Sequence, residues 1–206
     1  ERMSRWAYSG ILGSKLFKGH YYALSSNGAA VKAYVAALLH PADVDAAIAD
    51  TVELTMASHD DPFSISGACA VSAAVSRAFV PGCRIYDMAE AALHGAERGE
   101  ALARGRKDVW DYPGPSVAER LRMAVAAAVE SGADAAGEIR DLIGSGPAIA
   151  ETVPAAFGLL IARGGDVLEA MYDAVNLGDE TAAIASLVGQ LGGALYGAGI
   201  FPLDYL

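Results

Sequence analysis

The sequence predicts an all-α protein on three observations: abundant alanine, apolar residues at helical spacing, and very little of the alternation typical of strands. Alanine accounts for 43 of the 206 residues. It has the best helix propensity, and its small side chain lets helices pack closely. Since 53% of the residues are hydrophobic and only 19% are charged, a disordered chain is excluded. We therefore expect one all-α domain over residues 1–206.

Cap and turn residues set the expected helices in the first half. Residues 28–39 are an alanine-rich apolar run and predict one helix. Pro41 opens a second helix in its first turn, which continues to about Ala57. Asp61 and Pro62 are the N-cap and first position of a third helix. Residues 85–103 predict a fourth.

A loop over residues 108–115 separates the two halves, because it is rich in turn residues. A second break is expected at Gly144 to Pro147, a run of glycine, serine and proline. The remaining helices are expected over Ser116–Val129, Asp134–Ile143, Glu151–Ala162, Val167–Val175 and Thr181–Tyr196.

The last of these helices has the most informative pattern. Residues 181–203 carry no charge over 23 positions, which is long enough to span a bilayer. The many glycines, with Ser186 and Gln190, instead favour a helix buried in the core. Gly189, Gly193 and Gly197 fall four apart on one face, where missing side chains permit a close backbone crossing. We expect this helix to run through the middle of the fold.

The charge balance and the cysteines limit the partners and the compartment. Asp and Glu number 25 against 15 Lys and Arg, so a nucleic-acid partner is not expected. The short basic run 104–107 is interpreted as a solvated helix end. Cys69 and Cys83 are too few for a disulfide framework and are interpreted as reduced thiols of a cytoplasmic protein. No membrane partner is expected.

Several segments share their order and approximate spacing with one known family. They are Ser-Ser-Asn-Gly-Ala-Ala-Val-Lys from Ser25, Met-Ala-Ser-His-Asp-Asp-Pro from Met56, and the stretches 151–160, 165–170, 174–185 and 189–197. Together they resemble the C-terminal two thirds of the ADP-ribosylglycohydrolase family, which includes the dinitrogen-reductase-activating glycohydrolases. The resemblance runs from about residue 20 to Pro202. It implies that the family's N-terminal segment lies outside residues 1–206.

The resemblance also implies a fold and a reaction. It implies an all-α orthogonal multi-helix bundle with a two-magnesium site in a central cleft. The reaction is hydrolysis of the N-glycosidic bond between ADP-ribose and a protein side chain, or of a related ADP-ribosyl bond. The implied partners are an ADP-ribosylated protein or a small ADP-ribosyl compound. Bound metal ions suit this reaction because they can orient ribose hydroxyls and activate water.

Asp179, Glu180 and Thr181 are the candidate magnesium ligands. Carboxylate and hydroxyl oxygens suit Mg²⁺, although the same residues also fit a capped first turn of a helix. The resemblance places Glu180 where the family has its first Asp ligand. Ala182 and Ala183 stand in place of the second Asp and the second Thr. Because the family's N-terminal acid-acid-Thr motif is also missing, this chain carries at most half of a metal site.

Ser26, Asn27, Gly28 and His59 are the candidate substrate-binding residues. The first three precede an expected helix, so their backbone N–H groups are placed to receive a phosphate; an ordinary Asn-Gly turn is the alternative. His59 precedes the Asp61 helix start and is either a ligand contact or a structural hydrogen-bonding residue. Lys32 stands where the family often has Arg. The sequence does not identify the catalytic residue.

Two functions from different classes remain open, with a variant of the first. One is a magnesium-dependent ADP-ribosylglycohydrolase, and its variant is a hydrolase of another N-glycoside. The other is a non-catalytic member of the same fold that binds ADP-ribose or a nucleotide, or serves as an interaction module. A second copy of the chain is a further expected partner, as a homo-oligomer, if an apolar face is exposed.

Overall fold

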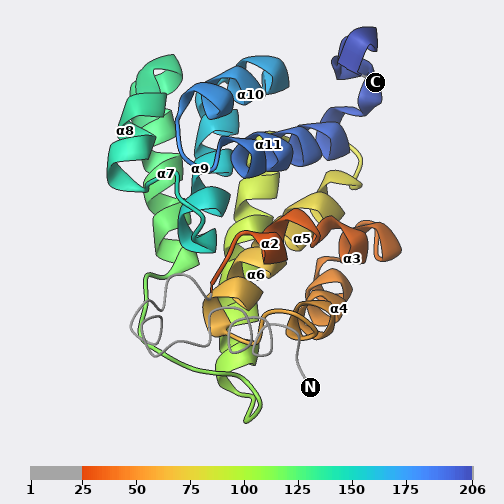
Figure 1. Ribbon diagram of the computed structural model, residues 1–206. Coiled ribbons are helices and arrows are strands. Elements are labelled where there is room, and N and C mark those ends of the chain that lie inside the picture. The colour runs from red at the N-terminus through yellow and green to blue at the C-terminus, as the bar shows by residue number, and fades with distance from the viewer. Residues whose placement is uncertain (1–24, 206) are drawn as a thin grey trace.

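The computed structural model describes residues 25–205, and every regular element in that range is a helix (Figure 1). The prediction of an all-α fold is therefore confirmed. The α-helices are α2 (Gly28–Val31), α3 (Tyr34–Leu39), α4 (Val44–Met56), α5 (Pro62–Ala78), α6 (Ile85–Arg104), α7 (Val117–Ser131), α8 (Ala135–Leu142), α9 (Ile149–Ala162), α10 (Val167–Asn176) and α11 (Thr181–Tyr196). Short 3-10 turns cover Gly132–Asp134, Ala198–Ile200 and Leu203–Tyr205.

Helices α5 and α9 form the centre of the bundle. Every residue of α5 from Pro62 to Ser76 is buried, as is nearly all of α9. Helix α5 packs against α2, α3, α4, α6, α9 and α11, while α7 and α8 pack beside α9 (Figure 1). The core sits around these two helices because their side chains are small or apolar on all sides.

Helix α11 lies across the bundle and not through its middle, so that prediction is wrong. It packs on α10, α9, α5 and α2 (Figure 1), but its buried residues all fall between Ile184 and Gly192. Ala182 and Ser186 are exposed. Helix α11 carries a single apolar stripe, and a helix of that kind buries one face only.

Small residues let the helices approach one another. A Cβ added at Gly95 would lie 2.7 Å from the Ala73 Cβ and closer still to the Cys69 carbonyl oxygen. One turn on, a Cβ at Gly99 would lie 2.7 Å from the Cys69 Cβ. Both glycines are in α6 and face α5. The abundance of small residues is thus explained by close helix packing, as the composition predicts.

The close approach on α11 uses a different glycine from those expected. A Cβ added at Gly192 would lie 2.6 Å from Val167 Cγ1, so α10 begins directly against the α11 backbone. At Gly189 and Gly193 an added Cβ would meet its nearest neighbours at the ordinary distances of 3.6 and 3.5 Å. At Gly197 it would meet nothing within 4 Å. The predicted crossing on that face is therefore wrong.

The apolar run of residues 28–39 forms two helices, α2 and α3, where one was expected. The break falls at Lys32, directly after α2. The Val31 carbonyl accepts a hydrogen bond of 3.2 Å from Gln190 Nε2 of α11. This carbonyl is held by α11 at the point where the helix stops.

Helix α4 also starts later than expected, at Val44. Asp43 is its N-cap and accepts a 3.1 Å hydrogen bond from the Ala46 N–H. Ala42 has φ +64°, which is not helical, so Pro41 belongs to the preceding turn. The start at Asp61 is confirmed, since its side chain accepts hydrogen bonds from the backbone of Phe63 and Ser64. The other expected boundaries agree to within two residues.

Two further expectations concern membranes and thiols. None of the helices in residues 25–205 combines the length and apolar character needed to cross a membrane. Cys69 is a buried free thiol and Cys83 a partly buried one. Burial raises the pKa of the Cys69 thiol, so it stays protonated and behaves as a small apolar core residue.

The close packing of α6 on α5 predicts that Gly95→Ala destabilises the protein. The added methyl would clash with backbone, at a cost of about 1–3 kcal/mol, which outweighs the roughly 1 kcal/mol gained in helix propensity. Gly137→Ala is the matched control, because it lies in α8 with nothing within 4 Å of an added Cβ. Urea unfolding should show a loss for the first and no loss for the second. Equal stability of the two variants would contradict this close packing of α6 on α5.

Candidate functional site

The segment that precedes α2 is fixed by pairing with the loop before α9. Ser26 and Ala148 form an isolated antiparallel bridge. The Asn27 N–H donates to the Pro147 carbonyl at 2.9 Å, and the Ile149 N–H donates to the Ser25 carbonyl at 2.8 Å. The backbone N–H of Asn27 is therefore already hydrogen-bonded within the chain. This pairing sets the Asn27 side chain beside the start of α9.

The Asn27 side chain joins three segments that are distant in sequence. Its Nδ2 donates to Thr152 Oγ1 at 3.2 Å and to Glu180 Oε2 at 3.4 Å. Thr152 Oγ1 in turn donates to the Gly146 carbonyl at 2.9 Å. One amide thus connects the α2 segment, α9 and the N-cap of α11. A candidate substrate-binding residue and a candidate metal ligand are in direct contact.

His59 lies on the other side of the same segment. Its Nε2 is 2.8 Å from Ser26 Oγ, and its Nδ1 is 2.9 Å from Ser58 Oγ. An added Cβ at Gly28 would lie 3.8 Å from His59 Nε2, so the ring borders the exposed Gly28. Lys32 Nζ donates to Ser58 Oγ. The four predicted substrate-binding residues are therefore adjacent, and we call them, with Thr152 and Glu180, the junction.

Asp61, the buried N-cap of α5, binds the residue that precedes the junction residue Ser26. Asp61 Oδ1 accepts from Ser25 Oγ at 2.8 Å and from Tyr112 Oη at 3.3 Å, besides capping the helix. Burial raises the Asp61 pKa, and the hydrogen bonds that Asp61 accepts from Ser64, Ser25 and Tyr112 oppose that rise. Asp61 therefore ties the Ser25 segment to the start of α5, directly after His59.

Electrostatics keep His59 neutral at pH 7. Its pKa is lowered to about 4, chiefly by burial and also by the positive charge of Lys32, while Asp60 acts in the opposite direction. Burial also lowers the pKa of Lys32. A neutral imidazole has one nitrogen that donates and one that accepts, so His59 can link two hydroxyl groups.

Of the three candidate metal ligands, Glu180 is the one in contact with Asn27. Its N–H donates to the Ser145 carbonyl at 2.9 Å, and the Thr181 N–H donates to the Asp179 carbonyl at 2.9 Å. Asp179 has φ +58°, a left-handed conformation that aspartate tolerates better than most residues. Its Oδ2 lies 3.3 Å from the position of an added Cβ at Gly146. The three residues thus form a tight turn into α11.

The donor set in residues 25–205 does not fit a complete magnesium site. No group of three or more His, Cys, Asp or Glu side chains there is placed to hold a metal ion. Glu180 Oε2 already accepts from Asn27. Ala182 and Ala183 follow in the chain, and methyl groups cannot coordinate a cation. No catalytic step is therefore assigned to a metal ion.

A comparison with protein families identifies the chain. The model of the ADP-ribosylglycohydrolase family matches residues 2–206. The chain belongs to that family. The match extends the sequence resemblance toward the N-terminus, and it supports a hydrolase of the glycosidase type in an all-α fold. The family is generally metal-dependent. No curated protein matches the chain at the significance required of a relative.

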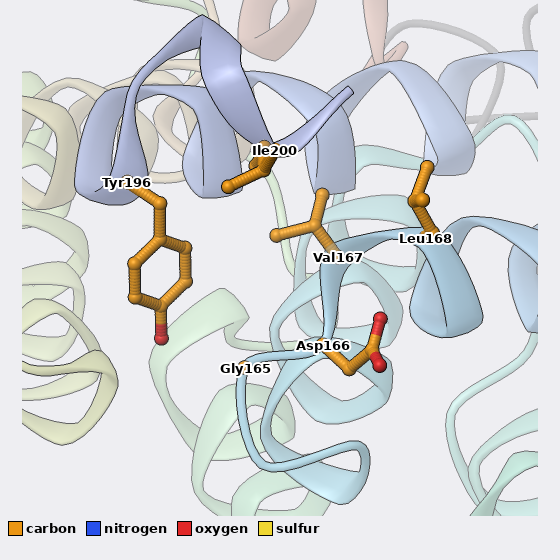
Figure 2. Close-up of a pocket in the computed structure, with 6 residues that line it drawn as sticks. All are labelled: Gly165, Asp166, Val167, Leu168, Tyr196 and Ile200. Carbon is orange, nitrogen blue, oxygen red and sulfur yellow. The ribbon is translucent and has the colours of Figure 1, made fainter. Parts of the chain in front are cut away.

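A separate hollow of about 330 Å³ lies at the other end of α11 (Figure 2). It is lined by Gly165, Asp166, Val167, Leu168, Tyr196 and Ile200. The Tyr196 side chain extends along one side of it (Figure 2), toward the position of an added Cβ at Gly165. Helix α11 has 16 residues and is about 24 Å long. The hollow is therefore far from Glu180, and its lining is mostly apolar.

Sequence reasoning missed three residues of this candidate site. Thr152 is a fully buried hydroxyl within the apolar helix α9, and its place in a family-like segment was the signal available. Glu151 accepts a 2.9 Å hydrogen bond from the Gly146 N–H. Ser58 carries no signal beyond its position next to His59. All three matter through tertiary contacts, which spacing along the chain does not show.

The lowered His59 pKa predicts a change of stability with pH. The unfolded protein binds a proton at His59 below about pH 6.5, whereas the folded protein does so only near pH 4. The free energy of unfolding therefore falls as pH drops from 6.5 to 4, by at most about 3 kcal/mol from this group. His59→Gln should remove that part of the pH slope in urea unfolding.

Asn176→Ala provides the control, because it removes an exposed side chain that carries no titratable group. It should keep the wild-type slope. Asp61, whose pKa is raised, contributes a slope of opposite sign that all three proteins share. If wild type and His59→Gln lose stability in parallel between pH 6.5 and 4, His59 is not a buried neutral group.

Proposed function

We propose that this glycohydrolase binds the ADP-ribosyl group at the junction and hydrolyses the N-glycosidic bond between ADP-ribose and its acceptor. The acceptor is a protein side chain or a small compound. One observation carries the proposal: Asn27 contacts Thr152 and Glu180 while the adjacent Ser26 contacts His59. Segments up to 153 positions apart in sequence, all within family-like stretches, converge on one place.

The polar groups of the junction complement the two parts of ADP-ribose. A pyrophosphate is bound by hydrogen-bond donors or cations, and cationic side chains are outnumbered in a chain with net charge −10. Ser26 supplies a hydroxyl, and Lys32 supplies a positive charge that is linked to Ser26 through Ser58 and His59. Ribose hydroxyls donate, and carboxylates accept such bonds strongly. Glu180 is partly exposed and is placed for that role.

The reaction adds water across the bond to the anomeric carbon. The carbon–nitrogen bond breaks, the carbon gains the hydroxyl of water, and the leaving nitrogen takes the proton. The transition state has oxocarbenium character. A carboxylate near the ribose stabilises that positive charge, and Glu180 is the carboxylate within the junction. Whether this hydrolysis requires magnesium is tested by experiment below.

The second candidate function is binding of ADP-ribose without hydrolysis. It is favoured by Ala182 and Ala183, which stand where the family carries further metal ligands, and by the incomplete donor set in residues 25–205. In either case the proposed partner is an ADP-ribosylated protein or a small ADP-ribosyl compound. The free thiols of Cys69 and Cys83 support a reducing compartment such as the cytoplasm.

One experiment separates the two functions. The full chain is incubated with ADP-ribosyl-arginine and with an ADP-ribosylated protein, each with magnesium and with a chelator. Free ADP-ribose is then measured by mass spectrometry, and ADP-ribose binding by calorimetry. Release supports the hydrolase, and a loss of release in chelator supports magnesium dependence. Binding without release supports the second function. Neither binding nor release would sink both.

Asn27 is predicted to be central to binding. Asn27→Ala removes the donor that holds Glu180 and Thr152 in register, so the Kd for ADP-ribose should rise about tenfold, which corresponds to about 1.4 kcal/mol. Asn176→Ala is the matched control, because that side chain is exposed at the end of α10 and donates to the Tyr172 carbonyl of its own helix. Calorimetry on the three proteins is the measurement. An unchanged Kd for Asn27→Ala would remove the junction from the binding site.

A further inference from the structure

A continuous line of hydrogen bonds leads from Lys32 into the junction. Lys32 Nζ contacts Ser58 Oγ, which is 2.9 Å from His59 Nδ1. His59 Nε2 is 2.8 Å from Ser26 Oγ. The structure thus places the positive charge of Lys32 at the start of a line of polar groups.

Lys32, at the start of the line, restricts which groups donate and which accept along it. A lysine ammonium group donates and never accepts, so Lys32 occupies a lone pair of Ser58 Oγ. Ser58 then has one proton of its own, and His59 Nδ1 is its nearby acceptor. The reverse arrangement would have Ser58 accept from both Lys32 and His59. It would leave the Ser58 proton without an acceptor in this line.

We infer that Lys32 and Ser58 hold His59 in the tautomer with its proton on Nε2, so that Ser26 accepts from His59 and offers its own proton to a ligand. All four groups then point their donors the same way, and aligned hydrogen bonds strengthen one another. The lowered pKa of His59 agrees with this, because only a neutral ring accepts a hydrogen bond at one nitrogen while it donates from the other. Asp60 is the other charged group that acts on the ring.

The consequence is a preference for ligands that present an acceptor at Ser26. The inference rests on the proposed function for the identity of that acceptor, a phosphate oxygen of ADP-ribose. Gly28, which borders both Ser26 Oγ and His59, leaves the approach free of a side chain. Lys32 contacts Ser58 and acts through it, so it is a positioning residue. A neutral nucleoside such as adenosine should gain little from it.

The tautomer is measured directly by nitrogen NMR of the histidine rings in the full chain without ligand, with His59→Gln used to assign the signals. We expect the His59 proton on Nε2. Lys32→Met keeps most of the side-chain length but removes the donor, and it should populate both tautomers. Lys107→Met, at an exposed lysine, is the control and should change nothing. The inference is overturned if the His59 proton is on Nδ1, or if Lys32→Met leaves the tautomer of His59 unchanged.

Binding gives the second readout. Calorimetry with ADP-ribose and with adenosine should show the Kd for ADP-ribose rise about fivefold in Lys32→Met, while adenosine binding stays the same. Lys32→Arg keeps a donor and should restore both the tautomer and the affinity. Equal losses for the two ligands would overturn the role in selectivity. If wild type binds no ADP-ribose, the proposed function fails, and the nitrogen shifts still decide the tautomer.

Discussion

The junction depends on a small piece of backbone pairing. The bridge between Ser26 and Ala148 docks the segment before α2 on the loop before α9. Without it, Asn27 would have no fixed relation to Thr152, which lies 125 positions further along the chain. Because the pairing uses backbone groups, it fixes position without consuming the side chains of Ser26 and Asn27. Those side chains remain available to His59 on one side and to Glu180 on the other.

Close helix packing makes this pairing precise. Helix α5 is buried on all sides, and Gly95 and Gly99 bring α6 against its backbone. Interfaces built from small side chains leave few rotamers to rearrange, so the ends of the helices are well defined in space. The N-cap of α5 at Asp61 and the start of α9 at Ile149 are two such ends. The junction is assembled from such helix ends, which a rigid core holds in place.

The sequence predicts the parts of this structure that are local. Asp61 and Pro62 mark a helix start because capping involves neighbouring residues only. The break between α2 and α3 was not predicted within residues 28–39. The hydrogen bond that accompanies it comes from Gln190, near the other end of the chain, to the Val31 carbonyl. Gly192, and not one of the spaced glycines, makes the closest approach to α10 for a similar reason. Spacing shows which residues share a face, but it does not show which face meets a neighbour.

The same distinction separates the two halves of the candidate site. Ser26, Asn27, Gly28 and His59 are adjacent, and the side chains of Ser26, Asn27 and His59 have hydrogen-bond partners inside the chain. At Glu180 a carboxylate remains, but it faces the Asn27 amide and is followed by two alanines. A carboxylate that accepts from an amide is oriented, and an oriented acceptor can hold a ribose hydroxyl without a cation. In the proposed function the retained groups therefore recognise the ADP-ribosyl group, and Glu180 is the carboxylate that faces its ribose.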